Sequence, residues 1–266
     1  MMGGADQQTG VWVYAIGRQL DQPAFRDLPG VDTAPVDLVR AGDLAAVVSS
    51  VDLDRFGADE LKRALNDLDQ LEQIARAHHH VVQVAAERPI VPMRMATIYD
   101  DEESVRLMLI ENSGAFTAAL HRVEGRQEWG VKAFASPAAS ASPETTAPVS
   151  GADYLKRRQA SLTAADESRR ASSAEADAVY RRLAGSAEAA RRHRPQDPRL
   201  SGDRRLMLLN AAFLIDSSAA GTFADVVEDI RRTHRSLDLE LTGPWAPYSF
   251  ATIDDTVSVS STEEPT

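Results

Sequence analysis

The first fifty residues have the hydrophobic pattern of β-strands. Residues 11–17 (VWVYAIG) form a nearly continuous apolar run that ends at glycine, which is typical of a buried strand. Residues 36–40 and 44–50 are also rich in apolar side chains, and they flank Ala41-Gly42-Asp43, a sequence that favours a tight turn. We therefore predict one strand followed by a β-hairpin.

A helical period follows the predicted hairpin. Between residues 61 and 85, apolar side chains recur at steps of three and four residues, which places them on one face of a helix. The residues on this face are Leu61, Leu65, Leu68, Leu71, Ala75, His78, Val82 and Ala85. The helix is expected to end before Pro89, because proline lacks a backbone N–H and disfavours helix in the preceding residue. An extended segment over 90–99 and helices over 101–111 and 113–124 complete this half of the chain.

The second half also mixes strands and helices. We predict, in sequence order, a strand over 128–134, a helix over 154–192, a strand over 206–215, a helix over 222–234 and a strand over 237–242. Parallel crossovers through the helices would give a small sheet covered on one face, which is a ferredoxin-like arrangement. The predicted fold class is therefore α+β, with two small sheet-plus-helix domains.

The domain boundary is predicted near residue 125. This gives an N-terminal α+β domain over 11–125 and a C-terminal ferredoxin-like domain over 126–251. Inside the second domain, residues 136–150 (SPAASASPETTAPVS) contain three prolines and otherwise almost only Ala, Ser and Thr. Such a sequence cannot build a core, so we expect a flexible loop there. Residues 1–10 and 252–266 are expected to be disordered.

Composition places the chain among globular proteins and removes several kinds of chemistry. Of the 266 residues, 43% are hydrophobic and 26% are charged, which suits packed cores in two domains. The chain has no cysteine, which excludes disulfides, thiolate metal sites and cysteine nucleophiles and fits a reducing cytosol. The longest apolar run, 206–215, is shorter than the about twenty residues that span a membrane, and no signal peptide is visible.

The net charge of −11 is unevenly distributed. Residues 155–194 carry ten basic and five acidic side chains, so one basic segment lies inside an acidic protein. It contains four arginine pairs, at 157/158, 169/170, 181/182 and 191/192. Steps of twelve residues rotate a position by about 120° on a helix, so the pairs spiral around it. A solvated helix with internal ion pairs is the favoured interpretation, and a nucleic-acid or regulatory binding module using the arginine-rich helix 154–192 is the alternative.

No motif supports catalysis, and no catalytic residue, cofactor or metal site is predicted. The run His78-His79-His80 cannot converge on one ion from a helix, because adjacent side chains point about 100° apart. We expect His78 to be packed or hydrogen-bonded, and a metal-dependent hydrolase completed by residues elsewhere is the alternative. The acidic run 100–103 lacks the spacing of a calcium loop and suits the start of a helix. Phosphate-binding glycine loops and nucleophile elbows are missing from the sequence.

The segment 243–250 (GPWAPYSF) combines two prolines with three aromatic residues directly after a predicted strand. Exposing so much aromatic surface to water is unfavourable, and two explanations stay open. Trp245, Tyr248 and Phe250 close the end of a domain core, or they form an interaction surface, where Trp and Tyr are preferred.

The longer segment 240–250 (ELTGPWAPYSF) resembles the closing motif of the gas vesicle protein F/L family. Further blocks resemble the family in the same order, so that the likeness covers about residues 11–251. These blocks are 44–49 (LAAVVS), 75–78 (ARAH), 89–94 (PIVPMR), 128–132 (EWGVK), 194–201 (RPQDPRLS) and 207–216 (MLLNAAFLID). The departures are mild. Ala246 replaces a second proline, Met95-Ala96-Thr97 replaces Phe-Gly-Thr, and Gln70 and His79 replace a common aromatic and a common acidic residue.

The resemblance implies a two-domain α+β protein whose C-terminal domain is a modified ferredoxin-like fold with a variable region. It implies a non-enzymatic minor structural or assembly protein, cytoplasmic and associated with the gas vesicle. Its expected partners are the hydrophobic gas vesicle shell protein and other accessory vesicle proteins, with no nucleic acid, membrane or small-molecule substrate. An acidic protein with an aromatic clamp could hold an apolar shell subunit that would otherwise aggregate. The candidate partner contacts are Trp245, Tyr248, Phe250 and Arg94.

Overall fold

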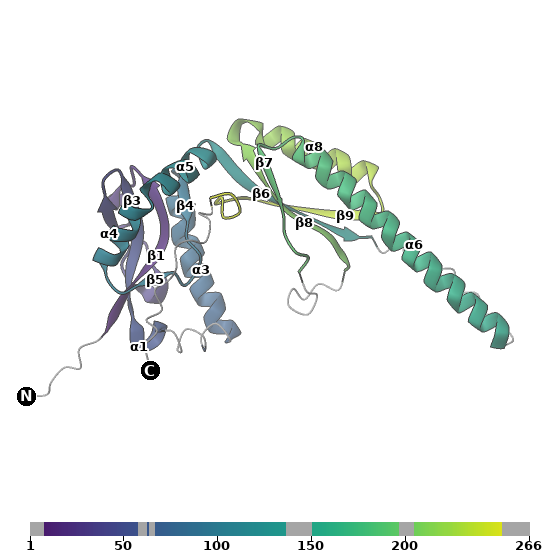
Figure 1. The fold of residues 1–266 in the computed structure, drawn as a ribbon, viewed down its shortest axis with the longest axis horizontal. Helices are drawn as coiled ribbons and strands as arrows, with labels where there is room; N and C mark the ends of the chain where they lie inside the picture. Colours follow the sequence, from purple (N-terminus) through teal and green to yellow (C-terminus); the bar gives the residue numbers. More distant parts are fainter. Residues whose placement is uncertain (1–7, 58–62, 64–66, 137–150, 197–204, 252–266) are drawn as a thin grey trace, which may run out of the picture. The chain divides into compact units, whose positions relative to one another are not determined.

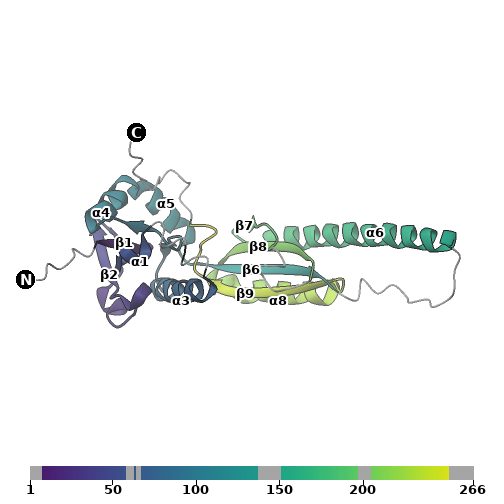
Figure 2. The same ribbon diagram turned by 90° about the horizontal axis from the view of Figure 1, so that it is seen from below.

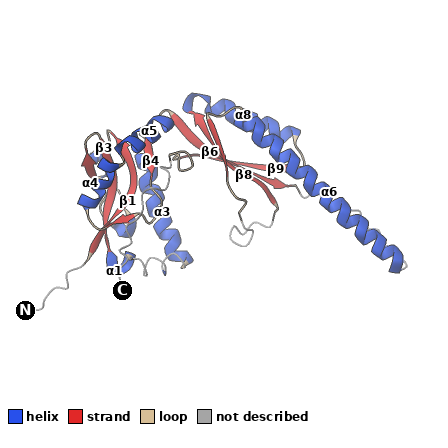
Figure 3. Cartoon of the chain, in the orientation of Figure 1, coloured by secondary structure: helices blue, strands red, loops and turns tan. Residues whose placement is uncertain are grey.

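The chain forms two compact units. The computed structural model describes residues 8–57, 63, 67–136, 151–196 and 205–251. Met1–Gly125 together with Ala246–Thr266 form the N-terminal unit, and Arg126–Trp245 form the C-terminal unit (Figure 1). Each unit combines one sheet with helices (Figure 3). The predicted α+β fold class is confirmed.

The two units differ from the predicted domains at the ends of the chain. Residues 246–251, which we expected in the second domain, belong to the N-terminal unit because they pack into its core. Thr9 and Gly10, which we expected to be disordered, lie in the first strand. The other residues of the predicted disordered termini, except Gln8, and residues 137–150 of the predicted loop lie outside the described residues.

The sheet of the N-terminal unit is antiparallel. Its strands are β1 (Thr9–Arg18), β2 (Asp37–Ala41), β3 (Leu44–Asp52), β4 (Ile90–Pro92) and β5 (Ile98–Tyr99). The strand order is β2-β3-β1-β4, and β5 also pairs with β1. The predicted hairpin is confirmed as β2 and β3, and Gly42 has the φ of 60° that their two-residue turn favours.

Helices cover both faces of this sheet. They are the short η1 (Gln22–Phe25), η2 (Val31–Thr33) and α1 (Leu53–Phe56), and the longer α3 (Leu68–Ala85), α4 (Glu102–Glu111) and α5 (Ser113–Val123). The longer helix α3 lies on one face, and α4 and α5 lie on the other (Figures 1 and 2). Because β1 is covered from both sides, it is buried continuously from Gly10 to Gly17. The helix α3 begins after Asp67, whose carboxylate accepts hydrogen bonds from two backbone N–H groups of the first turn.

A polar chain of three residues crosses the core of the N-terminal unit. Trp12 Nε1 donates to His78 Nδ1 over 3.0 Å, and His78 Nε2 lies 3.2 Å from the carbonyl oxygen of Met93. An indole nitrogen can only donate, so Nδ1 accepts, and the imidazole proton on Nε2 is donated to Met93. Burial lowers the pKa of His78 to about 4, which keeps the ring neutral at pH 7. The prediction of a packed and hydrogen-bonded His78 is confirmed.

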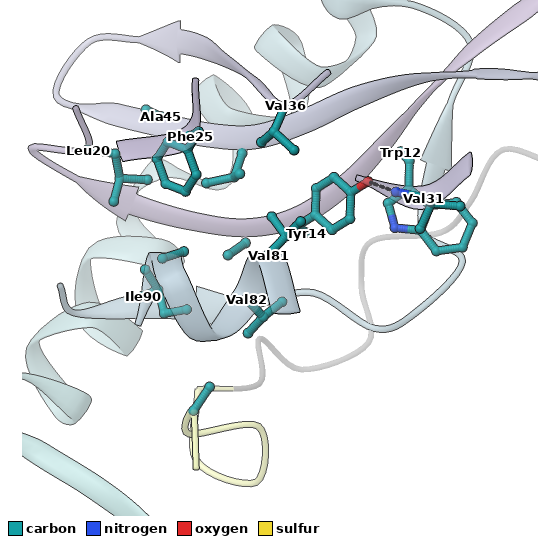
Figure 4. Close-up of a cluster of buried hydrophobic side chains, with 14 of the residues drawn as sticks. Trp12, Tyr14, Leu20, Phe25, Val31, Val36, Ala45, Val81, Val82 and Ile90 are labelled. Atoms are coloured by element: carbon teal, nitrogen blue, oxygen red, sulfur yellow. Dashed lines mark hydrogen bonds between the residues drawn. The ribbon is translucent and has the colours of Figure 1, made fainter. Parts of the chain in front are cut away.

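A second buried polar contact fixes the short helix η2. The Tyr14 hydroxyl lies 2.6 Å from Ser49 Oγ and accepts a hydrogen bond from the Val31 backbone N–H over 2.7 Å (Figure 4). A Cβ atom on Gly30 would lie 2.5 Å from the same hydroxyl, so glycine is needed at this close approach. Burial of the Tyr14 ring raises the pKa of its hydroxyl, which therefore stays protonated.

The C-terminal unit has the split β-α-β topology of a ferredoxin-like domain. Its strands are β6 (Arg126–Ala135), β7 (Ala189–Arg192), β8 (Met207–Asp216) and β9 (Leu237–Trp245), and its helices are α6 (Gly151–Ala184), the short η4 (Ser217–Ala219) and α8 (Ala220–Thr233). The strand order is β7-β8-β6-β9, and all neighbouring strands are antiparallel. The helical crossovers therefore join strands that are not neighbours in the sheet.

The predicted helix over 154–192 is wrong at its C-terminal end. The helix α6 ends at Ala184, and residues 189–192 form the edge strand β7, which pairs with β8. The sequence AARR has no β-branched residue, so strand pairing and not local propensity determines its conformation. Arg192 is held back against α6, where it forms an ion pair with Asp177 over 2.7 Å and stacks 4.2 Å from the centre of the Tyr180 ring.

Both described ends of the connector between β7 and β8 contact the side of the sheet opposite the helices. Arg205 forms ion pairs with Asp238 and Glu240 of β9, and its guanidinium lies 3.9 Å from the centre of the Phe134 ring. Lys132 of β6 donates to Gln196 over 3.1 Å. These contacts fix both described ends of the connector, whose middle, 197–204, lies outside the described residues.

The polar chain at His78 predicts a pH-dependent stability. The folded state binds a proton at His78 only near pH 4, whereas an unfolded histidine does so near pH 6.5. The free energy of unfolding therefore includes the full contribution of neutral His78 above pH 6.5. This contribution decreases as the pH falls toward 4, by about 3 kcal/mol in total. We expect urea unfolding followed by Trp12 fluorescence, in a Trp129→Phe/Trp245→Phe background, to show this loss. The His80→Gln variant should retain it, because His80 is exposed. An NMR titration that gives His78 a pKa near 6.5 would contradict the prediction.

The turn between β4 and β5 predicts a stabilising substitution. Ala96 has a φ of 67°, in the left-handed region where a Cβ atom is unfavourable. The Ala96→Gly substitution should stabilise the N-terminal unit by up to about 1 kcal/mol, since relief of this strain exceeds the added freedom of the unfolded chain. The matched control is Ala118→Gly at an exposed site inside α5, which should destabilise by about 1 kcal/mol. Thermal unfolding measures both changes, and equal losses would contradict the prediction.

Candidate functional site

The aromatic closing segment begins at an irregular end of β9. The pairing between β6 and β9 is regular as far as Thr242, opposite Gly130, and shifts register before Trp245, which faces Glu128. Gly243 lies in this bulge with a φ of 126°. A Cβ atom there would lie 3.0 Å from the Glu128 carbonyl oxygen and 3.2 Å from the Trp129 ring. Only glycine fits both the backbone conformation and the close packing.

Trp245 is the last residue of the C-terminal unit, and 43% of its surface is exposed. It ends β9 opposite Glu128, a side chain that is itself buried. A tryptophan exposed to this extent presents a large apolar area next to solvent, which is a common property of protein-binding surfaces. Of the three aromatic residues in the segment, Trp245 is the most exposed.

Residues 246–251 belong to the N-terminal unit and complete its core. Ala246 is buried in the same hydrophobic cluster as Trp12, and Tyr248 packs against this cluster. Phe250 is 7% exposed, and its carbonyl oxygen accepts a hydrogen bond from the Arg122 guanidinium of α5 over 3.0 Å. Tyr248 and Phe250 thus match the core-closing explanation, whereas Trp245 is partly exposed and its role in an interaction surface stays a prediction.

Arg94 lies in the turn that follows β4, on the N-terminal unit. Its side chain is exposed, and its carbonyl oxygen accepts hydrogen bonds from the backbone N–H and the hydroxyl of Thr97, over 3.2 and 2.7 Å. The turn is therefore internally fixed through its backbone. Arg94 and Trp245 belong to different units.

Asp101, Glu175 and His234 are acidic or histidine side chains that have hydrogen-bond partners within the fold. Asp101 caps α4 by accepting a hydrogen bond from the Ser104 N–H over 2.7 Å, and this bond holds the pKa of Asp101 below its usual value. In the C-terminal unit, Glu175 accepts from Ser236 and contacts His234. The carboxylate is central in that group, whereas a nucleophile relay requires the histidine in the centre. Within the described parts of the chain, no three such side chains are placed to bind a metal ion.

The arginine pairs do not form one basic surface. Arg182 forms an ion pair with Asp229 over 2.5 Å, and Arg192 of the short strand β7 pairs with Asp177 of α6. Only the pairs 157/158 and 169/170 lie on the part of α6 that packs against nothing described. No helix in the described ranges is sufficiently long and apolar to span a membrane.

An apolar patch on α4 was not identified from the sequence. Leu107 and Ile110 are 49% and 57% exposed, while Val105 and Leu109 of the same helix are buried. The sequence does contain a signal for this patch: Leu107 and Ile110 are three residues apart and lie on a different face of the helix from Val105 and Leu109. Among the described helices of the N-terminal unit, α4 is the one that carries two exposed large apolar side chains.

Comparison with known proteins gives consistent results. Residues 10–252 match the family described as gas vesicle synthesis protein GvpL/GvpF. Gas vesicle protein L of Streptomyces sp. (strain CB03234) is 39% identical over 252 residues, which cover 91% of this chain and 92% of that protein. Gas vesicle protein F of the same strain is 25% identical over 256 residues, covering 90% of this chain and 98% of that protein.

A solved structure has the same fold. The crystal structure of the gas vesicle protein GvpF from Anabaena sp. PCC7120 superposes with a TM-score of 0.67 at 20% identity, covering 92% of this chain and 97% of that chain. At this identity the likeness shows the fold alone. The family match over nearly the whole length, with the 39% identity to a gas vesicle protein L, establishes that the chain belongs to the gas vesicle synthesis protein GvpL/GvpF family.

Proposed function

We propose that this gas vesicle family protein is a non-enzymatic structural or assembly protein that binds the hydrophobic shell protein and other accessory vesicle proteins in the cytoplasm. The observation that carries the proposal is the family match over residues 10–252. The chemistry of the described side chains supports it, since the buried polar groups His78 and Tyr14 have structural partners inside the core. Their altered pKa values follow from burial.

The contact with an apolar partner is assigned first to Trp245. Its half-exposed ring offers apolar area, and the neighbouring residues Tyr248 and Phe250 anchor the adjoining segment in the N-terminal unit. Arg94 and the α4 patch of Leu107 and Ile110 are further contacts on that unit. The net charge of −11 would keep a complex with an apolar shell subunit in solution.

The Trp245→Ala variant tests this assignment. We expect capture of purified shell protein by the full-length chain to weaken about tenfold, because a central tryptophan contributes strongly to protein interfaces. The protein should remain folded, since the ring is not part of a described core cluster. A single substitution is preferable to a double substitution with Tyr248, because loss of Tyr248 would also disturb the core.

The control is Leu206→Ala, which removes another exposed apolar side chain from the C-terminal unit. It should leave capture unchanged. Equal capture by wild type and a folded Trp245→Ala protein would exclude Trp245 as the contact. Failure of every form, including wild type, to capture shell protein would contradict the proposed function itself.

A further inference from the structure

Among the described side chains of the long helix α6, those that pack onto the C-terminal unit lie in its last turns. Of these described side chains, Ser172, Ala176, Val179 and Leu183 are buried, and the last three belong to the core cluster of that unit. Two contacts reinforce this part: an ion pair of Arg182 with Asp229 of α8, and a side-chain contact of Glu175 with His234, the residue after α8. The docked part of the helix therefore spans residues 172–184.

The preceding part of α6 extends away from the sheet. Every residue over 156–170 whose side chain is described is exposed. These fifteen positions correspond to a helical length of about 22 Å, and Figure 2 shows the helix continuing past the ends of β6, β8 and β9. We call residues 156–170 the projecting segment.

The buried face of the docked part continues along the projecting segment. Leu183, Ala176, Arg169 and Leu162 lie seven residues apart, so they follow one stripe that drifts by about 20° per seven residues. Leu183 and Ala176 are buried on this stripe, whereas Leu162 is 60% exposed. Arg158 extends the same face by one further turn. The stripe thus carries an apolar centre with a basic residue on each side.

The charge of the projecting segment is opposite to that of the whole chain. It carries five basic residues, Lys156, Arg157, Arg158, Arg169 and Arg170, and two acidic ones, Asp166 and Glu167. Arg169 is 3.6 Å from Asp166, and among the described residues the other four cations have no ion pair. Arg182 of the docked part and Arg192 of β7, in contrast, are each paired with a carboxylate, Asp229 and Asp177 respectively.

From these features we infer that the projecting segment is a docking surface for an acidic amphipathic helix of a partner protein. The apolar side chain of such a helix would cover Leu162, and its carboxylates would pair with Arg158 and Arg169. Charge complementarity selects this partner. A second copy docked through the same segment would place two surfaces of net charge +3 against each other.

A nucleic acid fits this surface less well than an acidic helix does. The pairs 157/158 and 169/170 are rotated by about 120° from one another, and Asp166 and Glu167 lie between them. A duplex requires several cations on one side, each close to a phosphate. A helix laid along the stripe needs only one apolar contact and a cation on either side of it, which the segment supplies. The inference concerns a surface separate from Trp245 and does not depend on the proposed shell contact.

Two synthetic four-heptad peptides test the inference on the full-length chain. Both have Leu at positions a and d, and one carries Glu and the other Lys at positions e and g. We expect the Glu peptide to bind, with affinity that falls as salt increases, and the Lys peptide not to bind. Arg158→Glu/Arg169→Glu should weaken binding of the Glu peptide at least about tenfold, and Leu162→Ala several-fold. Because these side chains are exposed, circular dichroism and thermal unfolding should stay unchanged.

The matched control is Arg26→Glu/Arg88→Glu, which changes the net charge equally at exposed sites of the N-terminal unit and should leave binding unchanged. The inference is overturned by absence of Glu-peptide binding, or by equal binding of both peptides. Tighter binding of a twenty-base-pair DNA duplex would overturn it in favour of a nucleic-acid surface. Self-association that Leu162→Ala abolishes, measured by sedimentation, would assign the surface to a second copy. Capture of shell protein by Arg158→Glu/Arg169→Glu tests the proposed function independently, because the proposed shell contact is Trp245 and not the projecting segment.

Discussion

The N-terminal unit depends on a segment from the far end of the chain. Ala246 and Ala251 are fully packed in this unit, and the Phe250 carbonyl accepts a hydrogen bond from Arg122 of α5. The chain leaves the unit after Gly125 and returns at Ala246, so the core closes only when the intervening unit has been made. The boundary between the two units therefore falls inside the aromatic segment 243–250, between Trp245 and Ala246. Trp245 ends a strand with its ring half exposed, whereas residues 246–251 are held by packing in the N-terminal unit.

Most strands and helices could be predicted because their signals are local. The continuous apolar run of β1, the glycine turn between β2 and β3, and the three- and four-residue steps of α3 each depend on neighbouring residues. The strand β7 could not be predicted in this way, since Ala189–Arg192 favours helix by composition and becomes a strand only by pairing with β8. Likewise, composition marked Tyr248 and Phe250 as unusual, but only the three-dimensional structure shows that Tyr248 packs against the core cluster and that Phe250 is buried.

The position of each conspicuous polar residue has a physical reason within its own unit. Asp67, Asp101 and Asp216 each accept a backbone hydrogen bond at the start of a helix, so part of the acidic excess stabilises helix ends. His78 is neutral because its Nδ1 accepts the hydrogen bond from Trp12 and therefore carries no proton, while its Nε2 carries the proton donated to Met93. Sequence alone could place His78 on an apolar face, but one of its hydrogen-bond partners, Trp12 of β1, lies 66 residues away in the chain, and the other, Met93, follows β4.

The two parts of α6 show how a helix can remain ordered without tertiary contacts along its whole length. Helix formation is limited by the first turn, and short isolated helices are marginal in water. In α6 the turns over 172–184 are fixed by burial of Val179 and Leu183 and by the Arg182–Asp229 pair. The projecting segment extends an existing helix, so each added residue forms a backbone hydrogen bond without a new nucleation step. Its alanines and arginines favour helix, and so its side chains are free to be selected for charge and for contact with a partner instead of for packing.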